Sequence, residues 1–159
     1  MKQIKELGLS QTIELAILSN TMSKFFFSDN ETNLDNVIVS AISVASAAIT
    51  KGTSGRAVMS TVETSKGYLT LADASKKEYN AQIPLELFLK ADPIIYIKPK
   101  LVSIRNSYVD LPLINAVAIP AGPPPGFSIV FTFYYENFNP QKHVLNGLGE
   151  VVEELDYNN

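Results

Sequence analysis

The chain has 159 residues, 46% hydrophobic and 18% charged, with a formal net charge of −3 and no cysteine. The lack of cysteine excludes disulfides, thiolate metal sites and cysteine nucleophiles. The acidic balance and the scarcity of arginine argue against a nucleic-acid-binding protein, which needs a basic face. The length fits one compact domain, and the low share of charge indicates either a large core or a surface that neighbouring subunits cover in part.

Residues 1–33 are expected to form an N-terminal arm and linker. The apolar positions in residues 1–20 match helical spacing in part and strand alternation in part, so both alternatives stay open. We expect no secretory signal here, because Glu6 and Glu14 interrupt the apolar sequence. No apolar run reaches the roughly 18 residues that a spanning helix needs, so we expect no contact with a membrane.

Three consecutive phenylalanines, Phe25, Phe26 and Phe27, lie in the polar linker. They cannot all point to one side of a regular element, so at least one is expected to contact a second surface, in this subunit or on another. We predict that at least one inserts into an apolar pocket of another copy or of a partner protein, and we assign all three to an interface.

Residues 34–52 are predicted to form a helix with a surface of small and β-branched residues. Thr32 with Asp35 resembles a capping box, and Gly52 is suited to the residue that ends a helix. A helix with so little charge must be covered on most sides. One sheet covers only one side of a helix, so we expect another subunit to cover the rest. The predicted interface positions on this helix are Val37, Ala41, Ala45 and Ala48.

Residues 53–147 have the pattern of an antiparallel β-sandwich with Greek-key or jelly-roll connections, and the whole protein is expected to be mainly β. The clearest strand is 127–136, in which five aromatic or aliphatic residues alternate with more polar ones. The sequence Lys98-Pro99-Lys100 indicates a sheet edge. Other strands are predicted in the following segments: 57–63 and 68–73, joined as a hairpin through 64–67, then 83–90, 94–109 and 113–119. Segment 94–109 is either two short strands or one strand bent at Pro99.

The C-terminal residues 148–159 are predicted to form a solvated acidic tail. Glu153, Glu154 and Asp156 could bind a cation, but no calcium-binding loop surrounds them. His143, the single histidine, is interpreted as a surface or structural residue, because neither a base partner nor further metal ligands are evident. Residues 52–56 resemble a phosphate loop only faintly and are interpreted as a connector.

The sequence therefore predicts no catalytic residue, cofactor or metal, and we expect a protein that is not an enzyme. Its profile is typical of a structural subunit of a homo-oligomeric assembly, most plausibly a virus or phage particle assembled in the host cytoplasm, with other structural proteins of that particle as further partners. One alternative is a ligand- or carbohydrate-binding β-sandwich module that uses Tyr134 and Tyr135. An enzyme with an unfamiliar carboxylate site is a third hypothesis.

Overall fold

The computed structural model describes residues 8–27, 34–45, 50–52, 54–58, 66–79, 82–89 and 94–155. This part of the chain is mainly β, and its longest helical segment has five residues. The strands are β1 (Leu9–Ile17), β2 (Lys24–Phe26), β3 (Val37–Val44), β4 (Thr50–Lys51), β5 (Ala57–Val58), β6 (Tyr68–Thr70), β7 (Ile83–Pro84), β8 (Ile94–Val102), β9 (Tyr108–Asp110), β10 (Phe127–Asn137), β11 (His143–Leu145) and β12 (Val151–Glu154). The short 3-10 helices are η3 (Leu85–Leu89), η4 (Ile104–Asn106) and η5 (Ile114–Ala116).

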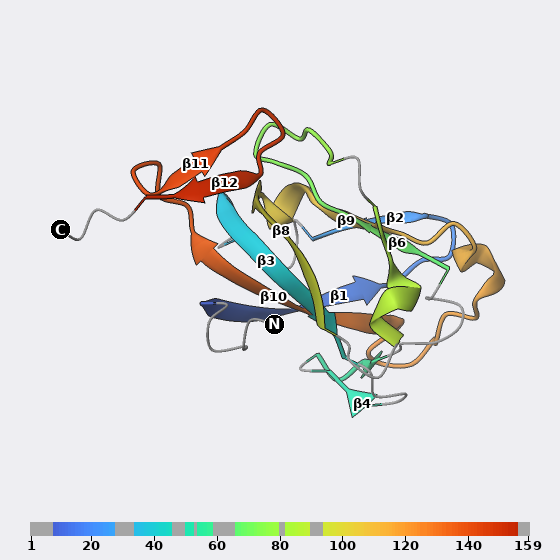
Figure 1. The fold of residues 1–159 in the computed structure, drawn as a ribbon. Coiled ribbons are helices and arrows are strands. Elements are labelled where there is room, and N and C mark those ends of the chain that lie inside the picture. Colours follow the sequence, from blue (N-terminus) through green and yellow to red (C-terminus); the bar gives the residue numbers. More distant parts are fainter. Residues whose placement is uncertain are drawn as a thin grey trace.

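Strand β10 organises the larger, six-stranded sheet. It pairs with β1 along its first nine residues and with β3 along its last seven, both antiparallel, and β8 continues the sheet beyond β3 (Figure 1). A short parallel contact joins β10 to β5, which pairs with β4. The predicted alternation of 127–136 is confirmed, because Phe127, Ile129, Phe131 and Phe133 all lie in the hydrophobic core.

The smaller sheet has the order β2-β9-β6-β7 and is antiparallel throughout. Its core-facing row consists of Phe25, Val109 and Leu69, which lie opposite one another on β2, β9 and β6. These side chains belong to the same hydrophobic cluster as the core-facing residues of β1, β3 and β10. The two sheets therefore share one hydrophobic core.

Strands β11 and β12 form a separate C-terminal hairpin (Figure 1). The hairpin meets the edge strand β8 at two backbone contacts. The Leu101 amide donates to the Gly149 carbonyl at 2.8 Å, and Lys100 forms an isolated antiparallel β-bridge with Glu150. The Tyr79 hydroxyl donates to the Leu101 carbonyl and lies against Gly149, whose φ of +74° favours glycine. Desolvation, followed by the nearby carboxylates of Asp73 and Glu150, raises the pKa of Tyr79 to about 12, so it remains a neutral donor.

The helix predicted for residues 34–52 is wrong, because Val37–Val44 is strand β3 and Thr50–Lys51 is strand β4. β3 lies between β10 and β8 and is buried along nearly its whole length. A strand buried on both faces has a continuous apolar sequence and not an alternating one, and β-branched residues favour it. The coverage that indicated another subunit is thus supplied by the subunit's own strands and core.

The predicted β strands are confirmed in part. Residues 94–109 form β8 and β9 with η4 between them, and Lys98-Pro99-Lys100 lies in the strand that ends the larger sheet. Residues 57–58 and 68–70 belong to different sheets, so they do not form the predicted hairpin; residues 59–65 lie outside the described part.

Two predicted strands contain 3-10 helices. In the described part of segment 83–90, which ends at residue 89, only Ile83–Pro84 is a strand, and η3 follows it. Proline cannot continue a ladder of donors, and Leu85 and Phe88, three residues apart, both reach the core from one side of a 3-10 turn. Within 113–119 the structure has η5 and no strand.

Strands also lie outside the segment 53–147 that was predicted to hold the β structure. Residues 9–17 and 24–26 are strands of the two sheets and not a separate arm, so for residues 9–17 the strand alternative is correct, whereas residues 1–7 lie outside the described part. Residues 151–154 form β12 and not a free tail, although Glu153 and Glu154 are exposed; Asp156 lies outside the described residues.

Candidate functional sites

The three phenylalanines of the predicted interface point in alternating directions. Phe25 and Phe27 are buried, and Phe27 packs edge-on against Phe131 and Phe133 of β10, with ring centroids 5.3 and 5.6 Å apart. This corrects their assignment to a subunit interface, since a strand sends alternate side chains to opposite faces. Phe26 points outward and is 48% exposed, so it is the one of the three whose ring a partner can reach.

The interface positions predicted on the supposed helix are mostly interior. Val37 lies in the core, and Ala41 is fully buried between β10 and β8. Neither is available to another subunit, because both are buried within this chain. Ala45 is half-buried, with its amide bonded to the Val130 carbonyl at 3.0 Å, and Ala48 lies outside the described residues.

Tyr134 and Tyr135 do not form one aromatic platform. Tyr135 packs against the core, whereas Tyr134 is opposite Ala41 on the outer face of the larger sheet. Ala41 is in turn opposite Tyr96 of β8. Adjacent strands are ~4.8 Å apart, so the two outer tyrosines are separated by roughly two strand spacings with a buried alanine between them.

A cluster of ionisable groups lies where the C-terminal hairpin meets the end of β10. Glu136, His143 and Glu154 place one potential ligand atom each within 4.8 Å of one another. His143 is buried, the Phe138 ring stacks over it at 5.8 Å, and its Nε2 lies 2.9 Å from Glu136 Oε1. Lys142 Nζ donates to the other carboxylate oxygen of Glu136 at 3.0 Å.

The hydrogen bonds of this cluster indicate a structural role. The Asn139 amide donates to His143 Nδ1 at 3.0 Å, so the neutral ring carries its hydrogen on Nε2 and donates it to Glu136. A metal on Nε2 would need that nitrogen's lone pair, which this tautomer does not offer. Burial alone would raise the pKa of Glu136, but hydrogen bonds, led by those from His143 and Lys142, outweigh it and hold the pKa below its usual range. The cluster fastens the hairpin to β10, in keeping with the structural role predicted for His143.

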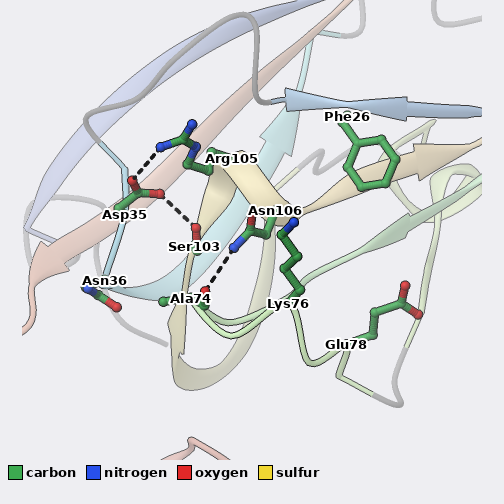
Figure 2. A pocket seen from close by; sticks show the side chains of 9 residues that line it. All are labelled: Phe26, Asp35, Asn36, Ala74, Lys76, Glu78, Ser103, Arg105 and Asn106. Atoms are coloured by element: carbon green, nitrogen blue, oxygen red, sulfur yellow. Dashed lines mark hydrogen bonds and ion pairs between the residues drawn. The ribbon is translucent and has the colours of Figure 1, made fainter.

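A cavity of about 780 Å³ opens beside the smaller sheet (Figure 2). Its walls come from β2, from the segment before β3, from the loop after β6 and from η4. The lining residues are Phe26, Asp35, Asn36, Ala74, Lys76, Glu78, Ser103, Arg105 and Asn106. Figure 2 shows the Phe26 ring on one side of the cavity and Asp35 with Arg105 on the other.

Local hydrogen bonds hold these walls in place. Ser103 lies at the N-cap of η4 but does not cap it; its hydroxyl donates to Asp35 Oδ1 at 2.7 Å. Arg105 Nη1 is 3.9 Å from Asp35 Oδ2, an ion pair at the surface. Asn106 Nδ2 donates to the Asp73 and Ala74 carbonyls at 3.0 and 3.4 Å, which ties η4 to the loop that carries Lys76.

None of the polar residues lining this cavity was predicted to be functional. They come from segments about 30 to 70 residues apart in sequence, so no local motif joins them. The one local signal is Asp73, whose carboxylate accepts from the amides of Ser75 and Lys77, both at 2.9 Å. This turn gives Lys76 a positive φ of 64° and shapes the cavity wall, but a turn signal alone does not indicate a binding site.

Exposed apolar side chains gather at two places. On the C-terminal hairpin, Leu148 and Val152 are each more than half exposed. Leu18, Met22 and Leu113 are equally exposed, in the β1–β2 connection and the segment after β9, which are joined by a backbone hydrogen bond. We call these groups the hairpin end and the loop end; Figure 1 shows the backbone segments that carry them at opposite sides of the molecule.

Comparison of the chain with protein-family models, with curated proteins and with solved structures finds no match. In the described part of the chain, no helix has the length and apolar character needed to cross a membrane.

Proposed function

We propose that this protein is a non-enzymatic structural subunit that assembles with copies of itself. The observation that supports this most is the pair of exposed apolar groups, the hairpin end and the loop end, on opposite sides of the molecule (Figure 1). Grouped exposed apolar side chains on a protein surface are typical of protein–protein contact sites. Their separation favours a head-to-tail contact, which gives rings or filaments.

The non-enzymatic part of the proposal is supported by the state of His143. Both of its ring nitrogens are engaged, one by the Asn139 amide and the other by Glu136, and the ring is buried. A general base needs a free nitrogen within reach of a substrate or nucleophile. His143 is the only histidine in the sequence.

We propose further that the six-stranded larger sheet and the four-stranded smaller sheet form a β-sandwich of the Greek-key or jelly-roll class. Support comes from the shared core, in which Phe27, just after β2, contacts Phe131 and Phe133 of β10. Side chains from facing sheets interdigitate in this way in sandwiches. As the assembly we propose a virus or phage particle, by analogy with other small β-rich subunits, and without nucleic acid or membrane as direct partners.

Light scattering coupled to size-exclusion chromatography, over a wide concentration range, tests the self-association. We expect oligomers of the unaltered protein, and monomers of both Leu148→Lys/Val152→Lys and Met22→Lys/Leu113→Lys, because a lysine in an apolar contact must be buried unpaired or open the contact. Tyr96→Lys, an exposed position on the outer face of the larger sheet, is the matched control and should leave the mass unchanged.

Mixing the two double variants distinguishes a head-to-tail contact from a contact between two identical ends. Each keeps one intact end, so a head-to-tail contact predicts a one-to-one dimer in the mixture although each variant alone is a monomer. If the hairpin ends instead contact each other, the Met22→Lys/Leu113→Lys variant will dimerise alone. A strict monomer at all concentrations would contradict the proposed function.

A further inference from the structure

The charges around the cavity described above balance. Asp35 and Glu78 contribute two carboxylates, and Lys76 and Arg105 contribute two cations. An anionic ligand would have to compete with Asp35 for Arg105, and a cationic ligand would have to compete with Arg105 for Asp35. The lining therefore favours a ligand without net charge.

One wall of the cavity is an exposed aromatic face. The Phe26 ring packs on the buried ring of Tyr108, with centroids 5.0 Å apart and planes tilted by 46°, and Lys24 lies over the Tyr108 ring at 4.8 Å. These contacts hold Phe26 in position while about half of it faces solvent. An exposed ring that is fixed before binding offers a stacking surface at little cost in conformational entropy.

The opposite wall presents hydrogen-bonding groups that are already oriented. Ser103 fixes Asp35, and Asp35 faces the Arg105 guanidinium. The Asn106 amide nitrogen is occupied by two backbone carbonyls, so the amide oxygen is the group that can accept from a ligand. A ligand with many hydroxyls suits such a wall, because each hydroxyl both donates and accepts.

We propose that this cavity binds a neutral oligosaccharide. The C–H face of one sugar ring stacks on Phe26, and hydroxyls of the oligosaccharide bond to Asp35, Arg105 and Asn106 on the opposite wall, with Glu78 as a further acceptor at the rim. The volume of about 780 Å³ lies within the range of small-molecule sites, ~300–1,000 Å³. This site is separate from the hairpin end and the loop end and does not depend on how the subunit associates.

Nuclear magnetic resonance titration of the full chain tests the proposal. The probes are maltotriose, cellotriose and N-acetylated chitotriose as neutral saccharides, with inorganic phosphate and sialyllactose as charged ones. We expect at least one neutral trisaccharide to bind, with saturation transfer to its ring C–H protons and amide shifts confined to residues 24–27, 35–36, 73–78 and 103–106. Weak, roughly millimolar affinity is sufficient, since the site is open to solvent.

Two variants and a control show whether the named residues bind the sugar. Phe26→Ala should weaken binding at least about fivefold, in line with the loss of one aromatic stack, and Phe26→Tyr should restore it. Tyr96→Ala removes an exposed ring from the other sheet and should change nothing. An unchanged amide spectrum outside the cavity verifies that each variant is folded.

Three results would overturn the proposal. They are the failure of all three neutral saccharides to bind at about 10 mM, equal binding by Phe26→Ala and the unaltered chain, and stronger binding of phosphate or sialyllactose at the same residues. The last result would reassign the cavity to an anionic ligand.

Discussion

At the scale of single residues, the direction of a side chain decides its role in this protein more than its type. Phe25, Phe26 and Phe27 are chemically identical, yet alternate pointing places two in the core and one at the rim of a cavity. Their clustering in the sequence indicated an interface, and only the strand pairing of β2 with β9 shows which ring stays accessible.

Substitution of these rings should separate their roles. Phe27→Ala is expected to lower the free energy of unfolding by about 3–5 kcal/mol, because it empties a fully buried site against Phe131 and Phe133. Phe26→Ala should cost less than about 1.5 kcal/mol, since its main partner is the Tyr108 ring. Chemical denaturation monitored by circular dichroism measures both. Equal losses would show that Phe26 is also a core residue.

At the scale of elements, the sequence predicts best where a strand has one polar face. The alternation of β10 and the charged edge of β8 could be recognised because polar residues define the period or block further pairing. β3 could not be recognised, since it has no charged residue over eight positions and its small and β-branched residues suit a buried strand as well as a covered helix. The cavity could not be predicted from the sequence for another reason. Asp35 and Ser103 are far apart in the sequence, and only the folded chain brings them into contact.

The C-terminal hairpin should loosen in acid. The pKa of Glu136 is lower in the folded protein than its usual value near 4.5. The ionised carboxylate therefore stabilises the fold, and this contribution is fully present at pH values above the usual pKa. The contribution is lost as pH falls through the lowered pKa, which removes the bonds from His143 and Lys142. Thermal unfolding followed between neutral and acidic pH measures this. Glu136→Gln should show a flatter acid limb; identical pH profiles would exclude the mechanism.

At the scale of the whole molecule, two apolar ends and a net charge of only −3 define how copies should associate. Apolar contacts are strengthened by salts that are excluded from protein surfaces, whereas contacts between charges are screened by any salt. Sedimentation velocity should therefore show a larger oligomer fraction in ammonium sulfate and little change with sodium chloride. Dissociation by sodium chloride would indicate instead that charged groups hold the copies together.

The central place of β10 also bears on how the chain folds as it is made. Residue for residue, β1 pairs with a strand that begins more than a hundred positions later, with Leu9 opposite Tyr135 and Ile17 opposite Phe127. β3 pairs with the other edge of β10 and therefore also depends on this late strand. Such distant pairing closes long loops and slows folding. On the ribosome, the early strands are synthesised well before their common partner emerges, so these strands stay open to chaperones and to premature association until β10 has been synthesised.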